Sequence, residues 1–308
     1  MEIITAREVP LGSLRAMKVY RTLPHRERTM IGAWCFVDHY GPEETAMDVA
    51  PHPHTGLQTV SWLFKGTIMH HDSADNHVVV APGEVNLMTA GAGICHSETS
   101  TTDTTILHGV QLWTALPDAA RHTTRRFDHF APPVTPIAGG ELLVFLGALA
   151  GATSPVPTFS PLLGAELRVF AHQTVTLTLN PSFEHGVLVD DGLITINGQS
   201  VARTELLFSP VGETQLRITN SGDHTARLIV IGGTPFEEEI VMWWNFIGRS
   251  SDEIKQYRAE WEAGSERFGT TRGYIARNPV GKARIPAPQL PPVELKPRGN
   301  TPRMRPLS

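Results

Sequence analysis

The chain has 308 residues, of which 41% are hydrophobic and 19% charged, a balance that excludes global disorder. Its 26 basic and 31 acidic residues give a formal net charge of −5, which excludes a chain-wide basic surface for nucleic acid. At about 100–200 residues per domain, this length predicts two domains. The 27 glycines and 24 prolines favour many short strands over long helices.

Strand-like runs separated by turn residues recur along the chain. A strong two-residue hairpin signal, Asn197-Gly198, follows one of them. Regular short strands with Gly/Pro turns predict an all-β sandwich or barrel. The predicted strands are 31–38, 59–64, 77–81, 106–114, 142–149, 165–170, 175–179, 187–189, 193–196, 205–208, 214–219 and 227–231.

A Pro/Thr/Ala/Gly-rich stretch at 131–140 predicts a linker between two β-rich halves. One helix is expected after the second half. Ser250 and Glu253 form a candidate capping box, and Gly264 is a natural stop. Apolar side chains recur on one face of this segment, at Ile254, Tyr257 and Trp261. We therefore expect this helix to cover a sheet.

The segment 277–308 differs in composition from the rest of the chain. It holds eight prolines and seven basic residues against a single acid, Glu294, so it cannot bury enough apolar surface to fold alone. We interpret it as a solvated arm, or one wrapped on the body, in preference to a nucleic-acid or partner contact.

Three signals bear on the compartment. The only cysteines are Cys35 and Cys95, which cannot build a disulfide framework. The first residues lack a signal-peptide pattern. The longest apolar stretch, 142–152, falls short of the roughly 18 residues of a membrane span. These signals predict a cytoplasmic protein with no membrane contact.

Four ligand-type residues are arranged as two spaced pairs, His52 with His54 and His96 with Glu98. In an extended segment, side chains two apart point to the same face. Two such pairs on neighbouring strands can aim four ligands at one point. Three imidazoles and a carboxylate suit a redox-active first-row metal such as Fe(II), with zinc as an alternative. Pro53 places its segment at a strand start or edge.

Other polar or aromatic candidates are weaker. The segment 70–73 either orients a ligand or forms a solvated turn. Asp48 either accepts a hydrogen bond from a ligand imidazole or has a structural role in its own loop. Cys95 should point away from His96 and pack in the core. Trp243 and Trp244 are expected to pack between the domains.

Several motifs in this chain together resemble the pirin family of the cupin superfamily. The likeness covers roughly residues 10 to 270, and the joint HPHxG and MTAGxGxxHSE pattern is specific. It continues in the second half through PFEEE at 235–239 and the 253–269 region. The motifs are DHYGP at 38–42, HPHTGL at 52–57, PGEVNLMTAG at 82–91, GICHSE at 93–98 and LW at 112–113.

The resemblance implies an all-β bicupin fold of two face-to-face antiparallel β-barrels, jelly-roll-like, with a short C-terminal helix. Residues 1–130 would form the metal-binding domain and 141–270 a cupin-like domain without metal, because His172, His185 and His224 stand alone. By position, the family's ligands to a single iron match His52, His54, His96 and Glu98. Most cupins take their glutamate from the first motif, where this chain has Gln58.

Some bacterial pirins act as quercetin 2,3-dioxygenases, and some mammalian ones act as iron-dependent nuclear cofactors. The leading hypothesis is therefore an Fe(II) dioxygenase that cleaves a flavonol-like enol with O₂ and releases carbon monoxide. Glu98 would be the base that accepts the substrate's hydroxyl proton. Val60, Trp62 and Phe64 would belong to the barrel wall, and the sequence leaves open which face of it they take. The alternatives are an iron- or redox-sensing module that regulates a protein partner, and a scaffold with an adventitious metal.

Overall fold

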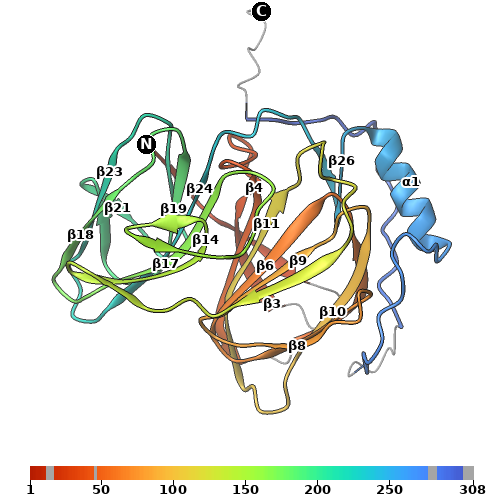
Figure 1. Cartoon of the computed structure of the whole chain (residues 1–308), viewed down its shortest axis with the longest axis horizontal. Coiled ribbons are helices and arrows are strands. Elements are labelled where there is room, and N and C mark those ends of the chain that lie inside the picture. The colour runs from red at the N-terminus through yellow and green to blue at the C-terminus, as the bar shows by residue number, and fades with distance from the viewer. Residues whose placement is uncertain (12–16, 45–46, 277–282, 301–308) are drawn as a thin grey trace, which may run out of the picture.

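A computed structural model describes residues 1–11, 17–44, 47–276 and 283–300, and Figure 1 shows it as two β-rich halves side by side. Each half contains one seven-stranded and one four-stranded antiparallel sheet. In the described chain no sheet closes on itself, so each half is a jelly-roll-like pair of sheets. The all-β bicupin prediction is confirmed at this level, with paired sheets in place of closed barrels.

The first half supplies strands to both of its sheets from residues 7–130. Its large sheet has the order β12-β9-β6-β11-β4-β3-β2 and its small sheet the order β5-β10-β7-β8. The strands are β2 (Arg7–Leu11), β3 (Met17–Leu23), β4 (Trp34–Glu44), β5 (Asp48–His54), β6 (Leu57–Lys65), β7 (Ile68–Asp72), β8 (His77–Val80), β9 (Val85–Thr89), β10 (Ile94–Ser100), β11 (Ile106–Ala115) and β12 (Arg126–Phe130).

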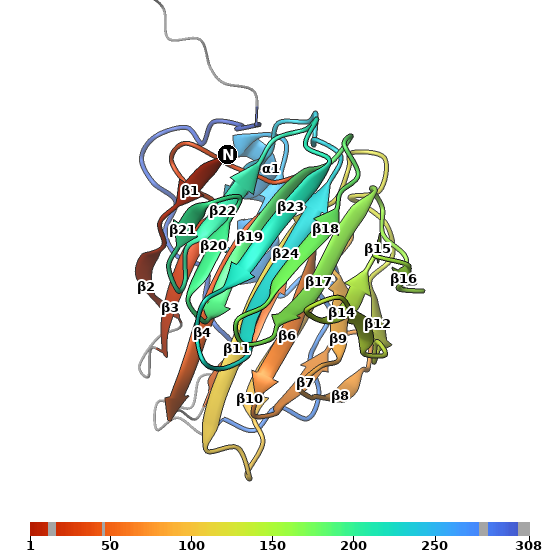
Figure 2. The ribbon, with the colours of Figure 1, turned by 90° about the vertical axis from the view of Figure 1, so that its left-hand side faces the viewer.

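The second half, which faces the viewer in Figure 2, repeats this plan. Its large sheet has the order β1-β22-β19-β24-β17-β14-β13 and its small sheet the order β18-β23-β20-β21. The strands are β1 (Glu2–Ile4), β13 (Thr135–Ile137), β14 (Gly140–Leu146), β17 (Leu162–Val169), β18 (Thr174–Thr178), β19 (Glu184–Asp191), β20 (Ile194–Ile196), β21 (Gln199–Val201), β22 (Leu206–Ser209), β23 (Gln215–Asn220) and β24 (Ala226–Gly233), with a hairpin of β15 (Ala148–Leu149) and β16 (Ala152–Thr153).

Most predicted strands coincide with observed ones, and the Asn197-Gly198 hairpin is confirmed. Both turn residues have positive φ, at 47° and 82°, and β20 pairs with β21 around them. The linker prediction is wrong in part, because β13 lies inside 131–140 and pairs with β14. Strand β1 pairs with β22, so the first residues of the chain belong to a sheet of the second half.

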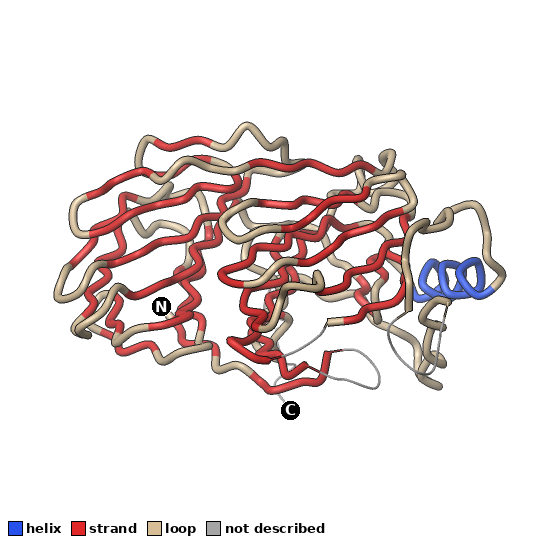
Figure 3. The backbone as a smooth tube through the Cα atoms, turned by 90° about the horizontal axis from the view of Figure 1, so that it is seen from below, coloured by secondary structure: helices blue, strands red, loops and turns tan. Residues whose placement is uncertain are grey.

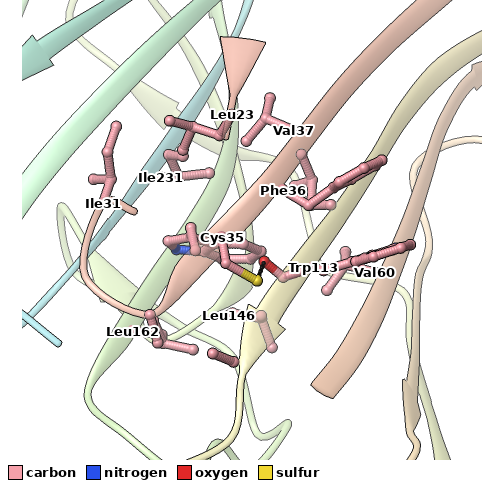
Figure 4. Packing of buried hydrophobic residues seen from close by; sticks show 14 of the residues in the cluster. Leu23, Ile31, Cys35, Phe36, Val37, Val60, Trp113, Leu146, Leu162 and Ile231 are labelled. Carbon is pink, nitrogen blue, oxygen red and sulfur yellow. Dashed lines mark hydrogen bonds between the residues drawn. The ribbon is translucent and has the colours of Figure 1, made fainter. Parts of the chain in front are cut away.

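A hydrophobic core fills the space between the two large sheets. It combines Trp34, Val60 and Trp62 of the first half with Phe145 and Ile231 of the second, all buried. Figure 4 shows part of this packing, with Leu23 and Cys35 near Ile231. Burial of apolar surface is the main favourable term in folding, so this shared core joins the halves.

The helix α1 (Ser251–Glu262) lies at the outer side of the first half (Figures 1 and 3). It follows the hairpin of β25 (Val241–Trp243) and β26 (Phe246–Gly248). The predicted apolar face is confirmed, since Ile254, Tyr257 and Trp261 are buried against Phe246 and neighbouring residues. The Ser250 side chain accepts the Glu253 amide at 3.2 Å, as a cap should. No helix in the described part of the chain is long and apolar enough to span a membrane.

The described part of the C-terminal segment, 283–300, wraps on the body. The Ile285 amide donates to the Pro51 carbonyl at 2.8 Å, and Arg298 pairs with Ile240. Arg284 donates to the carbonyls of Trp261 and Glu262 at 2.7 and 2.8 Å. This confirms the wrapped form of the predicted arm for these residues; 277–282 and 301–308 lie outside the described residues.

Candidate metal centre

Three of the four predicted ligands converge from two adjacent strands of the small sheet. His52 and His54 lie on β5, the edge strand that Pro53 predicts, and His96 lies opposite His52 on β10. The Nε2 atoms of His54 and His96 are 3.0 Å apart, and the His52 and His96 ring centroids are 4.3 Å apart. All three side chains are buried.

Glu98 follows His96 on β10 beyond a break in register, which lies between these two residues. Its carboxylate is buried and accepts a hydrogen bond from the Ser61 hydroxyl at 3.2 Å. Burial raises the pKa of Glu98, while nearby His70 and the Ser61 hydroxyl lower it in part. The carboxylate lines the same cavity as the three histidines.

His70 and Asp72 lie on the next strand, β7, and both are buried. The Nδ1 atoms of His70 and His96 are 3.5 Å apart, and His70 Nε2 is 3.2 Å from an Asp72 carboxylate oxygen. Of the two interpretations of 70–73, the solvated turn is therefore wrong for these residues. They hold the far side of the His96 ring, an arrangement typical of groups that orient metal-binding imidazoles.

Burial keeps the three converging imidazoles neutral. It lowers the pKa of His52 to about 4 and, together with the neighbouring histidines, the pKa of His54 and His96 well below the ordinary value. Neutral imidazole is the form that binds a metal ion.

The donor spacing also fits an ion. Two ligands at ~2.1 Å and a right angle from one metal lie about 3.0 Å apart, and the His54 and His96 Nε2 atoms have this separation. Three nitrogens and a carboxylate, buried beside a cavity, form a donor set that could hold a first-row metal with positions open to a ligand.

The cavity beside these residues has a volume of about 350 Å³, which is within the range of small-molecule sites. Its apolar wall includes Phe36 and Trp113, whose rings stack at 4.1 Å. Segments distant in the sequence also line the cavity, namely Trp244 and Asn245 at the β25–β26 turn and Ile285 of the wrapped arm. The remaining lining residues are Tyr40, Met47, Val49 and Gln111.

Val60, Trp62 and Phe64 lie in the wall formed by the large sheet, on the face of β6 that the sequence left open. These side chains pack at the core between the halves, and Ser61, on the opposite face of β6, turns toward the site instead. Both faces of β6 are buried, so apolar alternation could not tell the pocket face from the interface.

Trp243 and Trp244 lie on the β25–β26 hairpin, against the cluster under α1, so the expected interdomain packing is wrong. Cys95 packs in that same cluster, as predicted, and accepts the Thr271 hydroxyl at 3.0 Å. Asp48 accepts the Tyr274 hydroxyl at 2.8 Å.

Gln58 occupies the place of the usual cupin glutamate without leaving a free polar group. Its side-chain amide donates to Thr89 at 2.9 Å and its oxygen accepts from Thr114 at 3.2 Å. In the second half, His172 and His224 are exposed and pair with Asp223 and Asp191.

Two family models match this chain. The one described as Pirin covers residues 15–114, and the one described as Pirin C-terminal cupin domain covers residues 164–269. A Pseudomonas aeruginosa protein named "Putative quercetin 2,3-dioxygenase" is 41% identical over 296 residues, which is 94% of this chain and 91% of that protein. The chain belongs to the pirin family.

Other pirin-family relatives and solved structures agree with this assignment. A Pirin-like protein of Caulobacter vibrioides is 32% identical, covering 85% of this chain and 93% of that one. A crystal structure titled quercetin 2,3-dioxygenase from Acinetobacter baumannii superposes with a TM-score of 0.89 at 37% identity, covering 96% of this chain and 97% of that one. The Escherichia coli pirin YhhW, solved in complex with nickel(II), shares the fold with a TM-score of 0.60 at 19% identity, over 76% and 100% of the two chains.

Proposed function

We propose that the chain is a mononuclear iron dioxygenase that cleaves the central ring of a quercetin-like flavonol with O₂. The observation that carries the proposal is the convergence of His52, His54 and His96 beside a buried glutamate and an aromatic-walled cavity. The names of the similar proteins from P. aeruginosa and A. baumannii support the substrate class.

The site residues would hold the metal and the substrate in fixed positions. His52, His54, His96 and Glu98 would be the ligands, and His70 would fix the ring of His96 through its Nδ1 side. Bound iron would supply Lewis acidity toward the flavonol hydroxyl and a redox centre for O₂. The Phe36 and Trp113 rings would pack against the planar substrate.

Glu98 would serve as the base for the substrate's hydroxyl. Its raised pKa suits a carboxylate that accepts a proton and releases it later. Ser61, which donates to Glu98 Oε1, fixes the carboxylate while its proton is exchanged.

The test uses protein purified without oxygen and loaded with Fe(II). We expect one equivalent of iron at this site, consumption of O₂, loss of quercetin absorbance and release of carbon monoxide. His54→Ala should lower the rate by more than about 100-fold, because it removes a ligand. His172→Ala, which changes an exposed histidine of the second half, should leave the rate unchanged.

Two outcomes would separate the proposal from its alternatives. Iron binding with neither O₂ uptake nor quercetin loss would overturn the proposal that the chain is a dioxygenase. In that case, capture of a protein partner that depends on the iron oxidation state would favour the redox-sensing module.

A further inference from the structure

A second cluster of donor atoms lies between the two halves, away from the proposed iron site. It includes His39, which belongs to the DHYGP motif and has no part in the proposed reaction. His39 lies on β4 and His108 on β11, neighbouring strands of the first half, while Asp190 lies on β19 of the second. Their donor atoms all lie within 4.8 Å of one another, and all three residues are buried.

Both imidazoles contact the same carboxylate oxygen of Asp190. His39 Nε2 and His108 Nε2 each lie 2.6 Å from Asp190 Oδ1. The two imidazole nitrogens and this carboxylate oxygen therefore already lie close together. A small movement of the carboxylate, by a few tenths of an ångström, would reach the ~3 Å spacing of ligands around one ion.

The other atoms of Asp190 are held as those of a ligating carboxylate usually are. Arg227 donates to Oδ2 at 3.3 Å, and Arg203 donates to the Asp190 carbonyl at 2.9 Å.

An ion can reach this cluster from solvent. A cavity of about 700 Å³ at the junction of the halves is lined by His108 and Asp190. The same cavity is lined by the bases Lys65, Arg203 and Arg227 and by the acids Glu43 and Asp191.

We propose that His39, His108 and Asp190 form a second site for a divalent first-row metal, which joins the two halves. Two histidines and one carboxylate with open positions suit Fe(II), Zn(II) or Ni(II). The site is independent of the proposed dioxygenase activity, since it shares no residue with that centre.

The test counts Zn(II) equivalents in metal-free protein by titration against a chromophoric chelator. We expect two equivalents in the wild type, one in Asp190→Asn, one in His54→Ala and none in the double variant. Asn keeps an oxygen that can accept both imidazole hydrogen bonds but lacks the charge of a ligand. His172→Ala, which changes an exposed His–Asp pair, is the matched control and should keep two equivalents.

A second readout uses stability in the His54→Ala background. Zn(II) should raise the Tm there, because an ion that binds only the folded state stabilises it, and should not do so once Asp190→Asn is added. Equal zinc stoichiometry and equal Tm shifts with and without Asp190→Asn would overturn the second site. The loss of one zinc equivalent in His54→Ala tests the proposed iron centre and not the second site.

Discussion

At the scale of single residues, the burial of one histidine in the second half links folding to pH. His185 lies in the second half, 1% exposed, with its ring 6.0 Å from that of Phe183. Burial lowers its pKa to about 4, although a backbone hydrogen bond at Phe183 raises it in part. A histidine that stays neutral in the folded state makes stability depend on pH.

We expect the free energy of unfolding to fall as pH drops through this histidine's range. Between pH 6.5 and 4 the unfolded chain binds the proton and the folded chain does not, so stability rises with pH across that interval. His185→Gln should therefore lose about 2–3 kcal/mol less than the wild type on going from pH 7 to pH 4.5. Urea unfolding at both pH values measures the difference.

His172→Gln, which changes an exposed histidine of the same half, provides the control variant for this measurement. Identical pH slopes for wild type and His185→Gln would contradict the assignment.

At the scale of elements, the hairpin, helix and wrapped arm form a unit that borders the proposed iron site. The β25–β26 turn and the arm both supply cavity residues, while α1 packs beneath the hairpin. The start of the helix is fixed by its cap, and the Glu253 carboxylate accepts the Arg249 amide at 2.6 Å and pairs with Arg121 at 2.9 Å. The observed cap differs in part from the predicted capping box. Glu253 accepts the backbone amide of Arg249, which precedes the N-cap residue Ser250, and not the amide of Ser250 itself.

Removing the cap should destabilise this unit modestly. Ser250→Ala leaves the Glu253 amide without its acceptor, and we expect a loss of about 1 kcal/mol in the free energy of unfolding. Ser250→Asp, which can still accept that hydrogen bond, should stay near the wild type. A loss of equal size in both variants would show that the cap is not its cause.

At the scale of the whole molecule, the two halves are joined through a common core and through buried polar bonds. Trp34 donates its indole N–H to the carbonyls of Leu163 and Gly232, at 3.1 and 3.0 Å. Trp62 donates across the same interface to Glu166 at 2.7 Å. An interface of this kind favours unfolding of both halves together.

Trp34→Ala should therefore destabilise the entire chain. The lost burial and the cavity left behind should cost about 3–5 kcal/mol in the free energy of unfolding. Native-state hydrogen exchange followed by mass spectrometry should show faster exchange in core peptides of both halves. Faster exchange confined to the first half would mean that the halves unfold independently.

The local part of the site could be predicted from sequence, because it depends on strand geometry. His52 and His54 share a face by alternation, and Pro53 marked the edge strand that carries them. The cavity walls could not be predicted in this way. Trp244, Asn245 and Ile285 join the site from segments more than 100 residues away, and no periodicity encodes such contacts.

The fold was predicted at the level of two β-rich halves, and its pairing was not. The strand at 2–4 carries no signal that its partner is β22, and the short strand β13 is hidden in a stretch with linker composition. His39 likewise gave no sign of its partner, because Asp190 is 151 residues away in the chain.

The pairing of β1 with β22 has a consequence for synthesis on the ribosome. Ile4 is made early, whereas its partner Leu206 emerges about 200 residues later. At ~5–20 residues per second, this strand waits roughly 10–40 s before its partner exists. During that time β1 is without its partner strand, and one edge of the large sheet of the second half comes from a segment that is made about 200 residues before β22.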